Sequence, residues 1–329
     1  MAKALALFSG GLDSILAVKL LVNQGIDVVA VNFVSAFSSC AKDNCGVTEV
    51  AKQLGVPLKV VKLGDEYLKM IREPKHGYGK NMNPCIDCRI YILKKAKKIA
   101  EEIGADFIFT GEVLGERPMS QHFNALKVVE EESGLKGKIL RPLSAKLLPE
   151  TPIERKGLVD RKKLLDIRGR SRKPQLKLAE EFNIKSYPSP AGGCLLTCRE
   201  YANKLQDLFK HRKRCTMADA ALLKVGRHFR LGKNKIIVGR NEAENAVLKA
   251  KKARNDYYFE VPHTGSPITV LQGAKTKKAV KIAAALTAFY SDAKTAEVTV
   301  NFGRENLSNS LSVSVPARTE VENLRVGSC

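Results

Sequence analysis

The sequence contains no apolar run long enough to cross a membrane. A spanning helix needs ~18 to 20 consecutive apolar residues, and the first apolar run, residues 4–8, stops at a polar loop. No basic leader region or cleavage site accompanies that run, which excludes an ordinary secretion signal. We therefore expect a cytoplasmic protein that has no membrane partner.

Acidic residues are scarce relative to basic ones. The 56 Lys and Arg against 34 Asp and Glu leave a net charge of +22 over 329 residues. This excess is larger than solubility requires and predicts a polyanionic partner, with nucleic acid as the first candidate. The alternative is a solvated, Lys-rich surface of the heat-adapted kind, but such surfaces usually balance Lys with Glu. The chain also lacks internal repeats, and its length suffices for two domains.

A glycine-rich loop follows the first apolar run. Residues 4–8 form the continuous apolar segment typical of a buried parallel strand, and residues 15–21 have helical spacing. Gly10 and Gly11 lie between them, where they permit a positive φ and close approach of a ligand to the backbone. The amides of the following helix N-terminus then point at an anion. The sequence therefore predicts a phosphate site.

Two common phosphate-binding motifs are absent. No Lys follows the glycines before Lys19, which excludes the P-loop of nucleotide hydrolases, and a dinucleotide fingerprint would need a third glycine. The loop resembles instead the S-G-G-x-D-S loop of the pyrophosphate-loop (PP-loop) ATP pyrophosphatases, which cut ATP between its α- and β-phosphates and adenylate a carbonyl oxygen. That resemblance implies a site for ATP and Mg²⁺, with Asp13 near the metal, formed by Ser9, Gly10, Gly11, Asp13 and Ser14. The alternative is a plain turn in which Asp13 or Ser14 caps a helix.

Strand and helix patterns alternate through the first 200 residues. Apolar segments at 4–8, 28–33, 58–63 and 107–110 alternate with helical patterns at 15–24, 48–54 and 90–103. This order predicts an α/β fold with a doubly wound parallel sheet, whose ligands bind at the carboxyl ends of the strands. By the pattern of the PP-loop superfamily, Asn32 accepts adenine, and Thr110 and Gly111 line the nucleotide site.

Four of the eight cysteines form two close pairs. Cys85 and Cys88 make a C-x-x-C at the start of a helical pattern, where helix amides lower thiolate pKa values. Cys194 and Cys198 make a C-x-x-x-C after two glycines. Because the cytoplasm keeps thiols reduced, both pairs are suited to reaction or metal binding rather than to disulfides. The remaining cysteines carry a weak signal or none: Cys40, Cys45, Cys215 and Cys329.

The sequence around these cysteines resembles a tRNA-modifying family. Residues 83–88 resemble the N-P-x-x-x-C segment of the tRNA 2-thiouridylases, and Cys194 falls where that family carries its second cysteine. In that family the first cysteine takes up sulfur as a persulfide and the second helps to release it. Here Cys85 replaces the family's acidic residue after N-P. The three cysteines therefore also resemble the iron–sulfur branch of the PP-loop tRNA thiolases, in which three thiolates hold a [4Fe–4S] cluster.

Three interpretations of Cys85, Cys88 and Cys194 compete. We favour the cluster, followed by a persulfide relay; the third is a structural zinc site completed by Cys198. In either of the first two, the resemblance implies Asp13, Cys88 and Cys194 as the catalytic residues. The sulfur would come from sulfide or from a cysteine desulfurase or carrier protein.

Positive charge is concentrated after about residue 200. From residue 204 to residue 281 there are 19 Lys and Arg against six Asp and Glu, a net charge of +13. This region resembles the RNA-binding domain of the NFACT family, with V-G-R-N at 238–241, A-R-N-D-Y-Y-F at 253–259 and a P-G-S-like close at 263–267. With this resemblance, Tyr257 or Tyr258 is available to stack on a base. The alternative is that the tyrosines and Phe259 belong to the core, and for Phe259 we favour it. The resemblance also implies RNA contacts from Arg240, Arg254, His263 and Ser266.

These patterns predict an ATP-dependent tRNA-uridine sulfurtransferase that releases AMP and pyrophosphate. The domains expected are a PP-loop domain over 1–200, a smaller α+β RNA-binding domain over 201–300, and a polar, partly disordered tail over 301–329. The basic segment 166–182 either touches RNA or is a solvated start of a helix. The oligomeric state is left open, with a homodimer as one option.

Two other functions compete with thiolation. A small-molecule amidating PP-loop enzyme, of the NAD or GMP synthetase type, needs neither paired cysteines nor a basic segment. An RNA-binding quality-control factor would carry a degenerate ATP site, against which the intact Ser9, Asp13 and Ser14 argue. A tRNA-Ile lysidine synthetase is disfavoured because its chemistry uses no cysteine.

Overall fold

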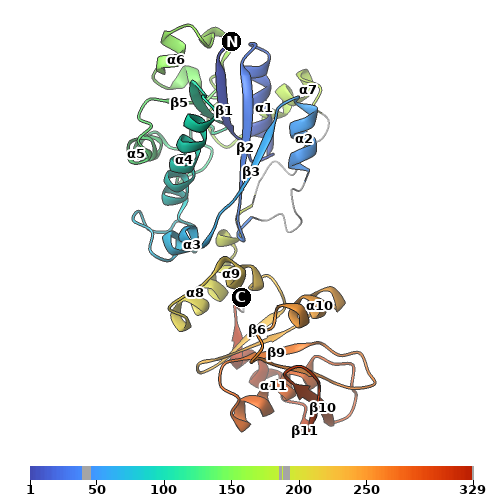
Figure 1. Ribbon diagram of the computed structural model, residues 1–329. Helices are drawn as coiled ribbons and strands as arrows, with labels where there is room; N and C mark the ends of the chain where they lie inside the picture. The colour runs from blue at the N-terminus through green and yellow to red at the C-terminus, as the bar shows by residue number, and fades with distance from the viewer. Residues whose placement is uncertain (39–45, 185–186, 188–192, 328–329) are drawn as a thin grey trace. The chain divides into compact units, whose positions relative to one another are not determined.

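The computed structural model describes residues 1–38, 46–184, 187 and 193–327. The chain divides into two compact units, Met1–Thr197 and Cys198–Cys329, drawn blue to yellow-green and yellow to red in Figure 1. No helix of the described residues is long and apolar enough to cross a membrane. Each unit has its own sheet and its own core.

The first unit is built on a parallel sheet of five strands in the order β3-β2-β1-β4-β5. Chain connections run outward from β1 to β2 and β3, then return to β4 on the other side of β1, so the switch point lies between β1 and β4. This confirms the predicted doubly wound sheet. Ligands of such sheets bind at the carboxyl ends of the strands beside the switch point. The strands are β1 (Lys3–Leu7), β2 (Asp27–Val34), β3 (Leu58–Lys62), β4 (Phe107–Thr110) and β5 (Ile139–Leu140).

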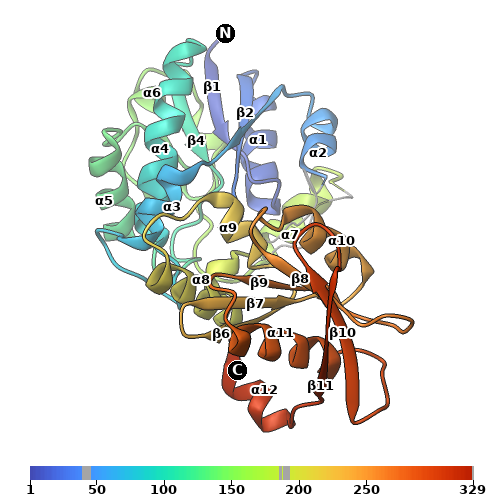
Figure 2. The same ribbon diagram turned by 60° about the horizontal axis from the view of Figure 1, so that its bottom comes forward.

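Helices cover both faces of this sheet because β1 is apolar on both sides. Ala4 and Ala6 pack with α1, α2 and α7, whereas Leu5 and Leu7 pack with α4 and α5; Figure 2 shows these two layers. The helices are α1 (Leu12–Val22), α2 (Val47–Gln53), α3 (Asp65–Arg72), α4 (Cys85–Glu102), α5 (Phe123–Ser133), α6 (Pro152–Arg155) and α7 (Lys173–Glu181), with short 3-10 turns η1 (Ala145–Leu147), η2 (Arg161–Lys163) and η3 (Leu195–Thr197).

Helix α4 begins five residues before the predicted start at residue 90. Its first intrahelical hydrogen bond runs from Cys88 N to Pro84 O at 2.8 Å. Asp87 lies in the first turn and accepts the amides of Lys75 and His76, both at 3.0 Å. The C-x-x-C is therefore part of the helix rather than of the loop before it.

The second unit is an antiparallel sheet in the order β11-β10-β8-β9-β7-β6-β12. Helix α11 packs on one face with Phe229, Ile236 and Phe259, and α10 packs on the other face against Ile237. The elements are α8 (Arg199–His211), α9 (Met217–Leu222), β6 (Arg227–Leu231), β7 (Asn234–Val238), α10 (Glu242–Lys251), β8 (Tyr257–Glu260), β9 (Thr269–Gln272), α11 (Lys277–Phe289), β10 (Glu297–Gly303), β11 (Asn309–Ser314), α12 (Arg318–Leu324) and β12 (Arg325–Val326).

The region that sequence analysis treated as a polar tail contributes to this sheet. Strand β11 pairs with β10, and β12 pairs with β6. The segment looks polar because β11 lies at the sheet edge and exposes most of its residues, while Val313 and Val321 are buried in the core. Few buried residues suffice to order an edge strand that has a paired backbone.

Phe259 should be among the most costly core residues of the second unit to truncate. It has no exposed surface and stacks on Phe302 with ring centroids 5.4 Å apart. We expect Phe259→Ala to lower the free energy of unfolding by about 3–5 kcal/mol, measured by urea denaturation. Val315→Ala, at an exposed site in the same unit, should change it by less than about 0.5 kcal/mol. Equal effects of the two substitutions would contradict the core assignment.

Candidate functional site

The glycine-rich loop joins β1 to α1 with its helix amides free. Gly10 has φ 74°, and a Cβ there would come within 2.7 Å of Val47 Cγ2. Gly11 is the N-cap residue of α1 and supplies no side-chain cap. Ser14 Oγ donates to Gly11 O at 2.8 Å and lies 3.3 Å from Ser9 Oγ. The loop thus presents uncapped amides and two hydroxyls, an arrangement that suits an anion.

Asp13 is paired with an arginine far along the chain. Both Oδ atoms of Asp13 accept from Arg172 Nη1, at 2.6 and 2.5 Å, and Arg172 Nη2 lies 2.8 Å from Glu116 Oε1. Burial, followed by the charge of Asp13, raises the pKa of Glu116. Sequence analysis missed this role of Arg172, because the basic segment around it offered only RNA or solvent as partners.

The end of β4 packs directly on the first turn of α1. A Cβ on Gly111 would lie 2.6 Å from the backbone carbon of Asp13 and 2.6 Å from Ser14 N, so only glycine fits. Beside it, Thr110 Oγ1 donates to Glu112 Oε2 at 3.1 Å. Asn32 is buried and donates from Nδ2 to Phe8 O at 2.7 Å, which ties β2 to the end of β1. These predicted residues therefore meet at one edge of the sheet.

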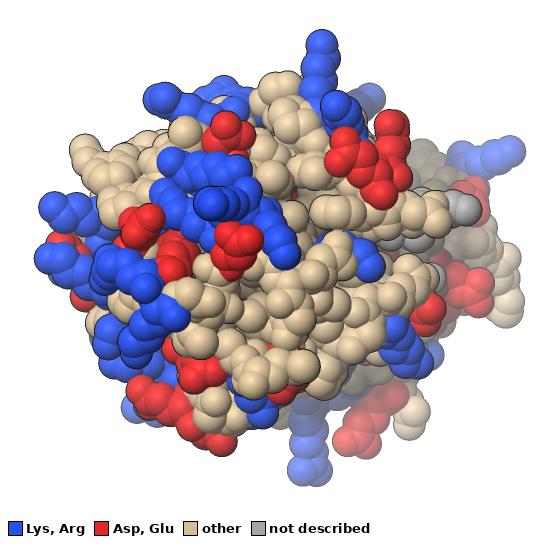
Figure 3. Space-filling view, turned by 90° about the horizontal axis from the view of Figure 1, so that it is seen from above, with Lys and Arg blue, Asp and Glu red and all other residues tan. Residues whose placement is uncertain are grey.

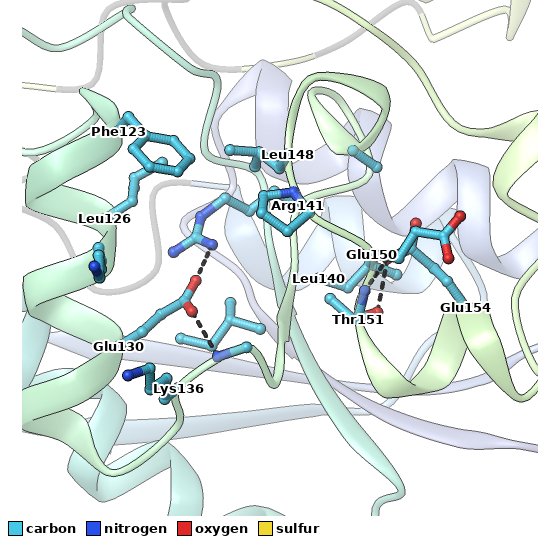
Figure 4. A pocket seen from close by; sticks show the side chains of 15 residues that line it. Phe123, Leu126, Glu130, Lys136, Leu140, Arg141, Leu148, Glu150, Thr151 and Glu154 are labelled. Atoms are coloured by element: carbon cyan, nitrogen blue, oxygen red, sulfur yellow. Dashed lines mark hydrogen bonds and ion pairs between the residues drawn. The ribbon is translucent and has the colours of Figure 1, made fainter.

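Glu112 is a buried carboxylate held by two arginines. It lies 3.3 Å from Arg89 Nε and 3.0 Å from Arg141 Nε, and its side chain is only 3% exposed. Burial raises the pKa of Glu112, but Arg89 and Arg141 outweigh burial, so the pKa is lower than usual. Arg141 also pairs with Glu130 at the wall of a cavity of about 260 Å³ (Figure 4). Thr110 completes the set of donors to Glu112.

Cys194 is held beside the C-x-x-C by two loops of the first unit. Leu195 N donates to Phe37 O at 2.9 Å, in the loop after β2, and Met82 N donates to Leu196 O at 3.1 Å, in the loop before α4. Cys194 therefore lies close enough to Cys85 and Cys88 for both to affect its pKa, while the role of the three thiols as a site stays a prediction. The three are free thiols.

Burial dominates the electrostatics of these thiols. Burial, with a smaller contribution from the nearby Cys88 and Cys85, raises the pKa of Cys194 to about 11. It also raises the pKa of Cys88, although the hydrogen bond with Tyr67 and the charge of Arg89 act in the opposite direction. The lowering expected from the helix N-terminus is therefore wrong for Cys88, because desolvation of a thiolate outweighs the helix amides.

Tyr67 was not identified from the sequence and contacts the thiols directly. Its hydroxyl lies 2.9 Å from Cys88 Sγ, and burial followed by Cys88 raises its pKa well above the usual value. Its ring lies 6.1 Å from that of Phe37 and 5.3 Å from that of Tyr91. A tyrosine on a short amphipathic helix such as α3 gives no sequence signal that distinguishes this contact from ordinary packing.

Arginine charges connect the thiols with the loop. Glu112, Cys88 and Cys85 raise the pKa of Arg89 against the opposite effect of its burial. Arg89 also lowers the pKa of Glu116, although burial and the charge of Asp13 outweigh this effect. The charge of Arg89 is therefore felt both by the thiols and by a carboxylate next to the glycine-rich loop.

The described residues contain no group of three His, Cys, Asp or Glu side chains spaced to hold a metal ion. The proposed metal ligands are thus close enough to influence one another, but the structure alone does not assemble a metal site. Cys198 is exposed and begins the second unit as the N-cap residue of α8. Cys40, Cys45 and Cys329 lie outside the described residues.

The RNA-contact candidates of the second unit have different environments. Arg240 pairs with Glu244; Arg254 and His263 are exposed. Ser266 Oγ accepts from Val261 N at 2.8 Å and donates to Pro267 O at 3.0 Å, so it holds its own turn. The two tyrosines also differ, because Tyr257 is half-buried whereas Tyr258 is buried.

Tyr258 is not available for stacking on a base. Its hydroxyl donates to Glu305 O at 3.2 Å, and its ring lies in the smaller core cluster of the unit. Phe259 is fully buried, as predicted.

The surface charge is not uniformly basic. Acidic side chains lie among the basic ones on the face seen in Figure 3.

Two family matches divide the chain in the same way as its fold. Residues 1–146 match the family described as thiamine biosynthesis protein (ThiI), and residues 226–324 match the NFACT protein RNA binding domain. The first unit thus contains a segment similar to the ThiI family, and the second unit contains a segment similar to the NFACT RNA-binding domain. Each match lies within one of the two units.

The curated relatives described here match less than half of the chain. A probable tRNA sulfurtransferase of Thermococcus kodakarensis is 33% identical over 150 residues, 43% of this chain and 36% of its own. A tRNA-specific 2-thiouridylase MnmA of Clostridium acetobutylicum is 36% identical over 118 residues, 31% of this chain and 33% of its own. The chain thus spans about a third of the length of the curated relatives that it matches.

Solved structures with lower identity resemble parts of the chain. The U34-tRNA thiolase NcsA from Methanococcus maripaludis with its [4Fe-4S] cluster has 17% identity and a TM-score of 0.35, covering 64% of this chain and 65% of its own. A 4-thiouridine synthetase–RNA complex with bound ATP has 20% identity and a TM-score of 0.34, covering 64% of this chain and 51% of its own.

Substitution of Gly111 should lower the stability of the first unit. The added methyl group of Gly111→Ala has to displace the first turn of α1, which we expect to lower the free energy of unfolding by about 1–3 kcal/mol in thermal or urea unfolding. Gly64→Ala is the matched control, because nothing lies within 4 Å of a Cβ there. Unchanged stability of Gly111→Ala would show that β4 does not hold this turn.

The pH dependence of alkylation should distinguish Cys194. A raised pKa favours the protonated thiol at neutral pH, so in metal-free protein the iodoacetamide rate at Cys194 should keep rising until pH about 11. Mass spectrometry of the labelled peptides measures this rate, with the exposed Cys198 as the faster internal reference at neutral pH. A rate that levels off near the ordinary thiol pKa of about 8.5 would contradict burial of Cys194.

Proposed function

We propose that the chain is an ATP-dependent tRNA-uridine sulfurtransferase. The observation that carries this proposal is the gathering of Cys85, Cys88 and Cys194 in the same domain as an uncapped glycine-rich loop, with arginine charges linking the two. The ThiI and NFACT matches and the names of the curated relatives support it.

In this proposal the loop binds the phosphates of ATP. The amides of α1, with Ser9 and Ser14, hold pyrophosphate, and Asp13 binds Mg²⁺ in place of its pairing with Arg172. The other nucleotide-site candidates line the same sheet edge, with Asn32 towards adenine and Thr110 and Gly111 beside the loop. A uridine carbonyl oxygen then attacks the α-phosphorus and pyrophosphate leaves.

Sulfur replaces the adenylated oxygen in the second step. A sulfur nucleophile adds to the ring carbon, and AMP leaves with the original uridine oxygen. Because a base edge has to reach the ends of the strands, we infer that the target nucleotide is flipped out of the tRNA.

The donor set of the three cysteines fits an iron–sulfur cluster. Soft thiolates select such clusters, and a cationic metal would oppose the raising of the Cys194 pKa by burial and by the neighbouring thiols. A [4Fe–4S] cluster held by Cys85, Cys88 and Cys194 would leave one iron without a protein ligand, to which sulfide could bind. The Tyr67 hydroxyl, 2.9 Å from Cys88 Sγ, would donate a hydrogen bond to that sulfur once Cys88 is a thiolate. A persulfide on Cys88, released with the help of Cys194, is the alternative.

The NFACT domain supplies the tRNA affinity in this proposal. Its region from residue 204 to residue 281 carries a net charge of +13, and phosphate contacts by Lys and Arg dominate such affinity. Arg254 and His263 are exposed and Arg240 is partly exposed, so these three are the contacts we favour. Ser266 positions the turn that carries His263 rather than touching RNA. The sulfur donor would be sulfide or a desulfurase or carrier protein.

The proposal is tested by anaerobic purification followed by iron and sulfide analysis. We expect iron in the intact chain and its loss in Cys85→Ala, Cys88→Ala and Cys194→Ala, with tRNA binding retained. Cys198→Ala is the matched control and should keep the metal. Asp13→Asn should slow tRNA-dependent pyrophosphate release by about 10²-fold, because a divalent-metal ligand is lost.

Other outcomes would identify the competing chemistries. Zinc that is lost in all four cysteine variants would indicate a structural site. A persulfide adduct on Cys88 in an iron-free, active protein would indicate the relay. Pyrophosphate release that does not depend on tRNA would contradict the proposal and favour a small-molecule substrate.

A further inference from the structure

The second unit contains a cavity that neither family match explains. Its volume is about 270 Å³, and it lies between α8 and α9 on one side and strands β6, β7 and β9 on the other. Three residues that are direct neighbours across those strands line it, namely Arg230, Lys235 and Gln272. Leu208, Leu222 and Ile237 form an apolar part of the wall.

Lys235 is buried in this cavity and lacks a close acceptor. Its side chain is 7% exposed, and its Nζ makes no hydrogen bond in the described part of the chain. The ion pair it has joins Nζ to Asp207 Oδ2 at 3.9 Å. That carboxylate is already taken, since Arg230 donates to both of its oxygens at 2.9 and 2.5 Å. Arg230 and Lys235, which lie opposite each other on neighbouring strands, thus share one carboxylate. Like charges at directly opposite positions lower the stability of a sheet.

The carboxylates that line the cavity are satisfied by other donors. Asp219 pairs with Arg212 and accepts the amide of Thr216 at 2.9 Å. Asp256 accepts the amide of Ala253 at 3.0 Å. The cavity therefore has a surplus of donors and a shortage of acceptors, which an anion would correct.

A second buried side chain, His228, has a ring nitrogen without a hydrogen-bond partner among the described residues, and this nitrogen is an acceptor rather than a donor. His228 is 1% exposed, and its Nε2 lies 2.8 Å from Val225 O, so Nε2 carries the proton and Nδ1 is an acceptor. Nδ1 has no hydrogen-bond partner among the described residues. Burial lowers the pKa of His228 well below its usual value, which keeps Nδ1 unprotonated. Because this atom is fully buried, it is an acceptor that the described residues leave unsatisfied beneath the cavity wall rather than a contact for a ligand.

We propose that this cavity binds the phosphoryl group of a single nucleotide, with Lys235 and Arg230 on the phosphate. Its volume of about 270 Å³ lies just below the usual range of small-molecule sites, about 300–1,000 Å³, so it admits one nucleotide rather than a strand. The phosphoryl group has two sources, a free mononucleotide or the phosphorylated end of an RNA. The leucines and Ile237 accept the apolar remainder.

The surroundings of Lys235 disfavour its charged form. Burial, with the charges of Arg230 and Lys204, lowers the pKa of Lys235 to about 8, although Asp207 acts in the opposite direction. A bound phosphate would raise this pKa, because an opposite charge favours the ammonium form.

The test compares binding of AMP, adenosine and inorganic phosphate to the full chain by calorimetry. AMP is also expected to bind at the nucleotide site proposed for the first unit. The measurement therefore concerns only the binding event that Lys235→Met removes. We expect that variant to bind AMP at this site at least about tenfold more weakly. Lys251→Met, at an exposed position of α10, is the matched control and should bind like the unaltered chain.

The RNA source is tested with short oligomers that differ only in a terminal phosphate or hydroxyl. Preference for the phosphorylated oligomer that is lost in Lys235→Met, without an effect on AMP, assigns the site to an RNA end. Loss of AMP binding alone assigns it to a free mononucleotide.

Hydrogen exchange on the unaltered chain keeps the test independent of how the variant folds. Phosphate should slow exchange of the amides in β6 and β7, whereas the same ionic strength of chloride should not. The proposal is overturned if phosphate gives no protection there, or if Lys235→Met and Lys251→Met bind AMP and both oligomers equally. Neither result bears on the sulfur chemistry proposed for the first unit.

Discussion

The close approach of the Gly111 backbone to the first turn of α1 determines the geometry of the sheet edge where we propose that the nucleotide binds. A Cβ on Gly111, directly after β4, would lie 2.6 Å from backbone atoms of Asp13 and Ser14, which leaves no room for a side chain there. The end of β4 and the start of α1 therefore form one surface. Thr110 and Glu112 lie on this surface and are hydrogen-bonded to each other. Arg89 pairs with Glu112 and lies close enough to Cys85 and Cys88 for them to affect its pKa.

Periodicity and motif spacing predicted most of the fold and the centre of the site. Continuous apolar strands separated by helical patterns fix a parallel sheet, and such a sheet brings Asn32, Thr110 and the loop to one edge regardless of side-chain detail. The grouping of the three cysteines was inferred from the resemblance to known thiolases, which carries information about distant parts of the chain, and their role as a site stays a prediction. Local patterns alone do not pair Cys194 with Cys88.

The parts that escaped prediction depend on distant side-chain contacts or on burial. Arg172 and Asp13 are 159 residues apart, and nothing near either residue indicates the other. The raised pKa values of Cys88 and Cys194 follow from desolvation, which a sequence position at a helix start does not reveal. Likewise, Tyr258 sits in an RNA-binding motif but serves the core, and the edge position of β11 made an ordered strand look like a tail.

The pairing of Arg172 with Asp13 and Glu116 has a consequence for how the nucleotide pocket fills. A carboxylate that already faces a guanidinium is electrically compensated before any metal arrives. In the proposed function, a divalent ion at Asp13 has to displace the Arg172 guanidinium instead of binding an uncompensated carboxylate. Under that proposal the displaced arginine is then free to pair with phosphate, so metal binding and phosphate binding would be coupled.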